Sequence, residues 1–258
     1  MRVKRIDQIE DFIIRNKFVT INELCEEFNI SKNTVRRDID FLTKIGTVKK
    51  VYGGVTINNI LPDPLTLSSF QERQIINEDL KIMVAKEASK YINDGDIIFI
   101  DTGTTTANII DYLEGIKDLT IITNSVIVLY KSLFYPNINV VSLPGVLKRV
   151  TASIVGSSAL QYIKDYNINK AFMACTGMST KVGITNSTHE EFKIKKAIIE
   201  KSQCNFLLLD KTKLGKTALL TYCQASDLDY IIMDSVPSNE YIEYFEENKA
   251  TLVVAKNL

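Results

Sequence analysis

The hydrophobic residues of the first 30 positions recur every three or four residues, the spacing that gives a helix one apolar face. This periodicity predicts one helix in RIDQIEDFIIRN and a second in TINELCEEFNI. The second run begins with Thr20, and Glu23 lies three residues after Thr20. We therefore expect a capping box in which each of these side chains accepts a hydrogen bond from a free backbone amide. Asn29 then offers the left-handed conformation in which helices often end.

A third periodic run, SKNTVRRDIDFLTKIG, predicts another helix, with Ser31 as its N-terminal cap and Gly46 as its stop. Three residues at positions i, i+4 and i+7 form its expected core face: Val35, Ile39 and Leu42. The next stretch, TVKKVYGGVTI, is typical of two short strands joined at Gly53-Gly54. Together these elements predict a winged helix-turn-helix domain in residues 1–57.

Polar side chains on the third helix and on the wing are candidates for contacts with DNA. Arginine pairs with guanine and asparagine with adenine, while lysine and threonine also hold phosphates. The candidate DNA-binding residues are Lys32, Asn33, Thr34, Arg36, Arg37, Lys49, Lys50 and Tyr52. The alternative is a small helical domain with a solvated charged face, particularly since Asp38 follows the arginine pair.

The pattern changes after the wing. Residues 58–70 contain two prolines and little charge, so we expect a linker there. From 71 to 258, helical stretches alternate with nearly continuous apolar runs: IIFID, LTIITN, NINVVSL, KAFMACT, NFLLLD, DYIIMD and TLVVA. Such runs are typical of parallel strands buried on both faces, so residues 71–258 are predicted to form a doubly wound, mostly parallel α/β domain.

The charge distribution separates the two parts of the chain. The whole chain has 31 basic and 31 acidic residues, yet positions 1–55 hold 11 basic and 8 acidic residues, a net charge of +3, which leaves −3 for the remainder. A basic first part and an acidic body suggest different partners. With one histidine and four dispersed cysteines, a metal site and disulfides are not expected. The chain has neither a run of about 20 apolar residues nor a signal-like apolar region, so a cytoplasmic location is expected.

Ligands of doubly wound domains bind beyond the carboxyl ends of the strands. Polar clusters occupy those positions at 101–106, 123–125, 144–149, 175–180, 185–193 and 210–216. In the first of them, DTGTTT, Gly103 permits a tight turn and the threonines offer amides and hydroxyls to an anion. The alternative is that these threonines only cap a helix. No nucleotide-type phosphate loop is present.

The third helix and wing closely resemble the N-terminal domain of the DeoR family of bacterial transcriptional regulators. The resemblance is carried by Thr34-Val35-Arg36-Arg37-Asp38-Ile39, then Gly46, then Gly53-Gly54, in that order and at matching distances. It implies that this part of the chain binds double-stranded operator DNA.

The resemblance extends through the body, in IIFIDTGTTTANI, LTIITNS, TASIVG, GITNSTHEEFKIKKAIIEKS and LLLDKTKLGKTAL. It implies a fold related to ribose-5-phosphate isomerase and coenzyme A transferases, and a sensor that binds a phosphorylated sugar. Gly103, Thr104 and Thr105 would cradle the phosphate. The remaining effector-binding candidates are Asp101, Thr106, Asn124, Lys148, Arg149, Thr176, Gly177, Glu190, Glu191, Lys193 and Lys213.

One departure from the family pattern bears on catalysis. Many members have Ala-Asp-Gly where this chain has Cys175-Thr176-Gly177, and Thr176 is no base at neutral pH. His189 is expected to be an exposed loop or cap residue, with contact to the effector as the alternative.

These observations predict a non-enzymatic repressor of a sugar-metabolism operon, regulated by a phosphorylated sugar and without a cofactor. One winged helix-turn-helix domain binds a DNA half-site only weakly, so we expect a homo-oligomer, either a dimer or a tetramer. The alternative is a sugar-phosphate isomerase or coenzyme A transferase-like enzyme with an appended DNA-binding head.

Overall fold

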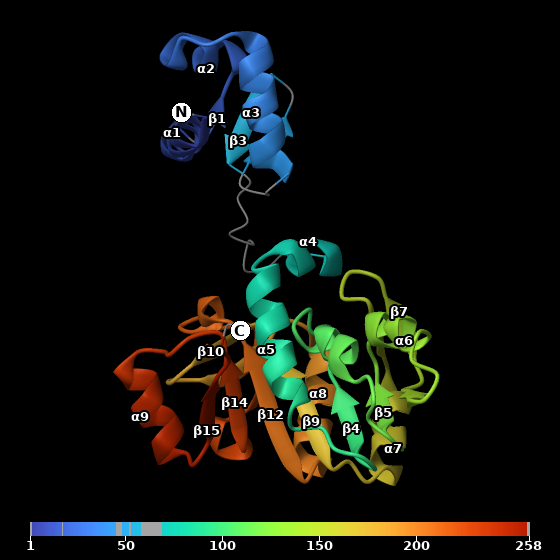
Figure 1. Ribbon diagram of the computed structural model, residues 1–258. Helices are drawn as coiled ribbons and strands as arrows, with labels where there is room; N and C mark the ends of the chain where they lie inside the picture. Colours follow the sequence, from blue (N-terminus) through green and yellow to red (C-terminus); the bar gives the residue numbers. More distant parts are fainter. Residues whose placement is uncertain (1, 17, 45–47, 52, 58–68, 257–258) are drawn as a thin grey trace. The chain divides into compact units, whose positions relative to one another are not determined.

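The chain forms two compact units, Met1–Thr66 and Leu67–Leu258 (Figure 1). The structure is a computed structural model that describes residues 2–16, 18–44, 48–51, 53–57 and 69–256. Most of the predicted linker, the predicted stop at Gly46 and the candidate Tyr52 lie outside these described residues.

The first unit contains three helices and a small antiparallel sheet. The helices are α1 (Arg2–Asn16), α2 (Ile21–Phe28) and α3 (Lys32–Lys44). The strands β1 (Phe18–Val19), β3 (Gly54–Ile57) and β2 (Val48–Val51) pair in that order. The helices and the wing strands therefore confirm the predicted winged helix-turn-helix.

The predicted local signals of this unit are present as atomic contacts. The Thr20 amide donates to the Glu23 carboxylate at 2.6 Å and the Glu23 amide donates to the Thr20 hydroxyl at 3.2 Å, which completes the capping box. Asn29 ends α2 with φ of 49°. Gly54 passes so close to β1 that a Cβ there would lie 2.5 Å from the Val19 carbonyl oxygen, which explains a glycine at this position.

The second unit is built on a seven-stranded parallel sheet with the order β15-β14-β12-β9-β4-β5-β6. Figure 1 shows β14 and β15 in red at one side of the sheet and β5 in green toward the other. The strands are β4 (Ile97–Ile100), β5 (Thr120–Thr123), β6 (Asn139–Ser142), β9 (Lys170–Ala174), β12 (Cys204–Leu209), β14 (Tyr230–Met233) and β15 (Thr251–Val254). All seven coincide with the predicted apolar runs, so the predicted α/β architecture is confirmed.

Helices cover both faces of this sheet. One face packs against α5 (Glu78–Ser89), α6 (Val126–Ser132) and the 3-10 helix η1 (Thr106–Tyr112). The other packs against α7 (Ser157–Asp165), α8 (His189–Lys201) and α9 (Asn239–Glu247). Successive strand residues alternate between the two cores, as Ile98 and Ile100 do with Phe99, so each strand is apolar on both sides.

Several short elements were not predicted. They are α4 (Phe70–Ile75), the hairpin β7 (Val146–Lys148) with β8 (Ser153–Val155), and an antiparallel sheet of β10 (Gly177–Ser179), β11 (Gly183–Asn186) and β13 (Leu220–Cys223). Two further 3-10 turns, η2 (Lys211–Lys213) and η3 (Ala225–Asp227), follow β12 and β13. Polar side chains and lengths of three to six residues leave these elements without a clear periodicity. No helix in the described part of the chain is long and apolar enough to cross a bilayer.

Candidate functional site

A small pocket lies at the carboxyl ends of β4, β9 and β12, three neighbouring strands of the parallel sheet. The chain adds β5 and β6 on one side of β4 and then returns to place β9 on the other side. This reversal is the position at which open α/β sheets leave a crevice for a ligand. The cavity volume is about 80 Å³, several times the space that one water molecule needs.

The turn after β4 forms one wall of the pocket. The Thr106 hydroxyl donates to the carbonyl oxygens of Asp101 at 2.8 Å and Gly103 at 3.0 Å and so closes the turn. Gly103 lies against Ala174, since a Cβ on Gly103 would approach the Ala174 Cβ to 2.3 Å. Within the described residues the hydroxyls of Thr104 and Thr105 have no hydrogen-bond partner, although both residues are buried and line the pocket.

The element after this turn is not the α-helix that the sequence led us to expect. It is the seven-residue 3-10 helix η1, and the Thr105 side chain makes no capping bond to it. The three threonines therefore divide their roles. Thr106 stabilises the turn, whereas Thr104 and Thr105 present their hydroxyls to the cavity.

Lys195 and Asp101 form a buried ion pair on a second side of the pocket. The Lys195 ammonium also donates to the Ala174 carbonyl oxygen at 2.9 Å, and the Asp101 carboxylate accepts from the Ala174 amide at 2.9 Å. The pair thus joins α8, β9 and the turn after β4. We conclude that its main effect is to fix the shape of the pocket.

Glu191, one helical turn before Lys195, is buried among hydrogen-bond donors. Its carboxylate accepts from Thr188 at 3.1 Å, Asn186 at 3.3 Å and Thr102 at 3.4 Å. Burial pushes the pKa of Glu191 up, but Lys195 and the hydrogen bonds outweigh burial and leave this pKa below its ordinary value. Glu191 is therefore held as a carboxylate.

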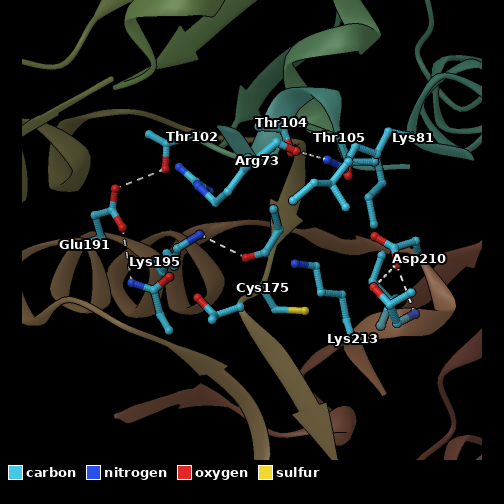
Figure 2. A pocket seen from close by; sticks show the side chains of 18 residues that line it. Arg73, Lys81, Thr102, Thr104, Thr105, Cys175, Glu191, Lys195, Asp210 and Lys213 are labelled. Atoms are coloured by element: carbon cyan, nitrogen blue, oxygen red, sulfur yellow. Dashed lines mark hydrogen bonds between the residues drawn. The ribbon is translucent and has the colours of Figure 1, made fainter. Parts of the chain in front are cut away.

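Three further cations border the cavity: Arg73 from α4, Lys81 from α5 and Lys213 from η2 (Figure 2). Arg73 is half-buried, and its guanidinium Nε is buried without a hydrogen-bond partner. In the part of the chain that the structure describes, Arg73 has no ion pair, and its guanidinium lies 5.7 Å above the Phe70 ring. A buried guanidinium without a carboxylate partner costs free energy, which an incoming anion would recover.

Lys81 experiences the same positive surroundings. Burial, then the positive charge of Lys213, and less strongly that of Arg73, lower the pKa of Lys81 from 10.5 to about 8, although Asp210 and Glu78 act in the opposite direction. The Lys81 ammonium donates to the Arg73 carbonyl oxygen, which ties α5 to α4. Burial also raises the pKa of the neighbouring Cys175 thiol to about 12, so this cysteine is not a thiolate.

This arrangement suits the binding of an anion better than proton transfer. Four cations and two unpartnered hydroxyls converge on a cavity of about 80 Å³. A general base needs a pKa near the working pH, whereas the pKa of Glu191 is lowered and its oxygens are already engaged. Thr176, at the position of the family carboxylate, lines the pocket and accepts a hydrogen bond from Ser187 at 3.2 Å.

The structure brings only part of the predicted effector-binding set to the pocket. Among the predicted residues, those lining the cavity are Gly103, Thr104, Thr105, Thr176, Glu191 and Lys213, with Asp101 and Thr106 supporting them from behind. The residues that do not line it are Asn124, Lys148, Arg149, Gly177, Glu190 and Lys193.

Each of these six residues has another local role or position. Asn124 donates to the Ile154 carbonyl oxygen at 3.1 Å and holds β8 in place. Lys148 and Glu190 form an exposed ion pair at 2.8 Å, and Arg149 is exposed in the β7–β8 turn. Gly177 packs against the backbone of residue 216, with space for no side chain. His189, at the start of α8, is exposed beside Phe192.

Lys193, a predicted effector-binding residue, lies on the exposed face of α8 and does not border the pocket. The buried residues of α8 are Glu191, Ile194, Lys195, Ile198 and Ile199, a spacing of three and four. Lys193 falls outside this stripe, is exposed and borders a groove between α7 and α8. The i, i+4 pair of Glu191 and Lys195 within an apolar stripe is the sequence signal that points to Lys195 as the lysine at the pocket.

The sequence prediction also missed Arg73, Lys81, Thr102, Asn186, Asp210 and Thr212 as pocket residues. Lys81 lies on the buried side of a predicted helix, where a lysine is unusual enough to suggest a role. Arg73 carried no such signal, because α4 has only six residues.

The predicted DNA-contact residues lie at the surface of the first unit. The exposed ones are Lys32, Asn33, Arg36, Arg37, Lys49 and Lys50. Thr34 is half-buried and shares a hydrogen bond of 2.9 Å with Ser31 at the start of α3, and Lys50 pairs with Asp40 on α3. Within the described residues, Arg36 and Arg37 have no hydrogen-bond or ion-pair partner.

Asp38 does not weaken the positive character of this surface. It is 1% exposed, points to the opposite side of α3 and pairs with Arg5 of α1 at 2.9 Å. The charged face of α3 is therefore more basic than the linear sequence suggests, which counts against the alternative of a merely solvated helix. Among the described residues, no group of three or more histidine, cysteine, aspartate or glutamate side chains could hold a metal ion, and all four cysteines are free thiols.

A winged helix-turn-helix unit followed by a doubly wound unit with an anion-sized pocket defines a DNA-binding transcription regulator with a ligand-sensing domain. Comparison with known families agrees with this class. The DeoR-like helix-turn-helix domain matches residues 5–60, and the DeoR C terminal sensor domain matches residues 76–235. The chain belongs to the DeoR family of transcriptional regulators.

Named relatives match over nearly the whole chain. The HTH-type transcriptional regulator IolR of Bacillus subtilis is 41% identical, covering 99% of this chain and 100% of IolR. The HTH-type transcriptional repressor GlcR of the same species is 25% identical over 98% of this chain and 96% of its own length. The lactose phosphotransferase system repressor of Staphylococcus epidermidis is 28% identical, covering 94% and 97% respectively.

Solved structures offer a weaker likeness. A D-ribose-5-phosphate isomerase in complex with phospho-erythronic acid is 22% identical, covers 53% of this chain and 54% of its own, and has a TM-score of 0.40. At this score the likeness contributes nothing to the conclusions below.

Proposed function

We propose that this regulator represses genes of sugar metabolism and that a phosphorylated sugar controls its affinity for the operator. The sugar would bind in the pocket at the ends of β4, β9 and β12. The observation that carries the proposal is Arg73. Its guanidinium, with a buried and unpartnered Nε, lacks a carboxylate partner within the described residues and borders the same cavity as Lys81, Lys213 and two threonine hydroxyls. A phosphate group supplies the charge and the acceptor oxygens that these groups lack.

The size of the cavity suits the phosphate end of such a ligand. The volume of about 80 Å³ is well below the range of roughly 300 Å³ and more that encloses a drug-sized molecule. The phosphate would therefore occupy the enclosed part, with the sugar extending toward solvent or inducing a wider opening. The relatives GlcR and the lactose phosphotransferase system repressor are both named as repressors, and the name of the second refers to a sugar. These names support a sugar-related role for this chain.

In this proposal the exposed face of α3 enters the major groove. Arg36, Arg37 and Asn33 read base edges, while Lys32, Thr34 and the wing residues Lys49 and Lys50 contact phosphates. Tyr52, which lies outside the described residues, remains a predicted wing contact. The protein acts in the cytoplasm on double-stranded DNA and needs no cofactor.

The proposed sensor performs no chemistry on its ligand. An isomerase must move a proton beside a carbonyl group. Thr176 cannot do so, and Glu191 is a poor base because its pKa is lowered and its oxygens already accept from three hydrogen-bond donors. Incubating the protein with pentose and hexose phosphates tests this point, and measurable turnover would revive the enzyme alternative.

The path from the pocket to the operator begins at α4. This helix starts directly after residues 58–68, and its Arg73 is one of the expected phosphate ligands. Capture of a phosphate by Arg73 and Lys81 would hold α4 against α5 in the arrangement that the bound state prefers. A ligand that binds one arrangement more tightly shifts the population toward it.

A screen of sugar phosphates by thermal shift tests the proposed ligand class. The effective sugar phosphate should stabilise the wild type, and Arg73→Gln should lose most of that shift because a charge-assisted hydrogen bond is removed. Lys193→Gln is the matched control, since it removes one positive charge outside the pocket. Equal shifts in both variants would exclude Arg73 from the site, and the absence of any shift across the panel would refute the ligand class.

A further inference from the structure

An exposed apolar surface lies on α6 and the β7–β8 hairpin, away from the residues that line the pocket. Six large hydrophobic side chains there are about half exposed or more: Tyr130, Leu133, Phe134, Val146, Leu147 and Val150. We name this set the α6–β7 surface. We propose that it is the face through which a second copy of this chain binds.

Backbone contacts hold the segment around α6 and the β7–β8 hairpin next to each other. Ser125, just before α6, forms an isolated bridge with Ser153 of β8. The Val126 amide donates to the Ala152 carbonyl oxygen at 2.9 Å, beside the turn that carries Val150. Tyr130 lies on α6, and Phe134 follows two residues after the end of that helix at Ser132. The two rings pack edge to face with their centroids 5.7 Å apart.

The hairpin adds an open strand edge to this surface. In the described part of the chain β7 pairs with β8 alone. The register places Leu147 opposite Ile154, and the Ile154 amide donates away from β7, to the Asn124 carbonyl oxygen at 2.8 Å. Opposed residues in an antiparallel ladder point their backbone groups either both inward or both outward. The N–H and C=O groups of Leu147 therefore point to the open edge.

An open antiparallel edge is self-complementary. Two copies related by a twofold axis can place β7 beside β7, with each copy offering the same donors and acceptors. The cations next to the surface would oppose such an approach only weakly, because Lys131 pairs with Asp111 at 2.5 Å and Lys148 with Glu190 at 2.8 Å. Arg149, in the hairpin turn, adds one charge beside Val150.

The available area is close to what a stable interface uses. Six such side chains offer on the order of 100 Å² each, about 600 Å² in all, compared with roughly 800 Å² per partner in a standard interface. The backbone edge of β7 contributes further area. A second copy is also the partner that a helix-turn-helix protein needs, since one head reads one half-site.

The surface is connected to the pocket through the hairpin. The Val150 carbonyl oxygen accepts from the Phe70 amide at 2.8 Å, at the start of the helix that carries Arg73. Ser153 of β8 lies close enough to the Glu191 carboxylate to help lower its pKa. Pairing of two copies through this face would therefore be linked to each effector pocket through the hairpin and the start of α4.

Light scattering during size-exclusion chromatography of the full chain tests the proposal. We expect the wild type to run as a dimer or a larger even assembly and Leu133→Asp to halve that mass. Two symmetry-related carboxylates buried at the contact should raise the dissociation constant on the order of 100-fold or more. Leu219→Asp is the matched control, because Leu219 is 74% exposed and Leu133 75% exposed, yet Leu219 lies outside the surface.

A second variant tests the strand edge independently. Leu147→Pro removes a donor that points away from β8, so the hairpin should persist while association weakens. Circular dichroism and the thermal shift given by inorganic phosphate report whether each variant is folded with an intact pocket.

The outcomes separate this proposal from the proposed function. A monomeric wild type, or a wild-type mass for Leu133→Asp, would overturn the α6–β7 surface, and so would equal masses for Leu219→Asp and Leu133→Asp. A wild-type mass for Leu147→Pro would remove the strand edge from the interface. None of these masses depends on sugar-phosphate binding, whose failure would appear only in the thermal shifts.

Discussion

The pKa of Lys81 leads to a specific prediction about pH. Because burial and the neighbouring charge of Lys213 lower this pKa to about 8, a bound anion should favour the charged lysine and raise the pKa again. A lysine with a pKa of about 8 is about nine-tenths protonated at pH 7 and one-tenth at pH 9. If only the charged form binds, affinity should fall about tenfold between these two pH values, or about 1.4 kcal/mol.

Isothermal titration calorimetry measures both the affinity and the proton uptake. Sulfate is a suitable first probe, because this tetrahedral dianion does not titrate in the range and leaves Lys81 as the group of interest. At pH 8, titrations in two buffers with different ionisation enthalpies should show uptake of up to about 0.5 proton per anion. Lys81→Met should bind more weakly and lose this pH dependence, whereas Lys193→Met, which changes an exposed lysine, should keep it.

The same shift affects the stability of the ligand-free protein in the opposite direction. Unfolding returns Lys81 to an ordinary pKa of 10.5 from about 8. Between these values the unfolded chain binds more protons at this position, so the contribution of Lys81 to stability rises with pH.

Wild-type affinity for sulfate that is constant from pH 7 to pH 9 would refute the reasoning about Lys81. An equal dependence of affinity on pH in Lys81→Met would refute it as well.

Three further predictions concern both units. Gly103→Ala should destabilise the second unit by about 1–3 kcal/mol in urea unfolding, because its Cβ would overlap Ala174; wild-type stability would show that the turn can move aside. Arg37→Asp should abolish specific operator binding in a gel shift and leave the sugar-phosphate thermal shift unchanged, and normal operator binding would contradict the proposed contact face. Asp38→Asn should lower the free energy of unfolding of the first unit by about 2 kcal/mol, because it weakens the pair with Arg5. Hydrogen exchange should show this as faster exchange of the α3 amides, and unchanged exchange would mean that the pair does not stabilise the unit.

The regular elements were predictable because each carries a periodic signal. The seven parallel strands are nearly continuous apolar runs. The N-termini of helices such as α2 carry capping residues, which can be recognised from neighbouring residues alone. The DTGTTT turn was found for the same reason, since Gly103 and its threonines follow a strand directly.

The pocket was only partly predictable because most of its cations depend on tertiary packing. Lys193 was predicted around the ligand, but Lys195 is the lysine that α8 directs to the pocket, because two residues along a helix change the face completely. Lys148 and Glu190 were expected around the ligand but pair with each other at the surface. Arg73 reaches the cavity from a six-residue helix that precedes the other signature segments in the sequence, and no local sequence pattern predicts this position.

The uncompensated charge around Arg73 and Lys81 also has a consequence for the lifetime of the protein in a cell. Molecules with an empty pocket carry the full cost of those cations, so they should open more often and be degraded sooner by proteases than molecules that hold a metabolite. Starvation for the metabolite would then lower the number of regulator molecules as well as change their occupancy.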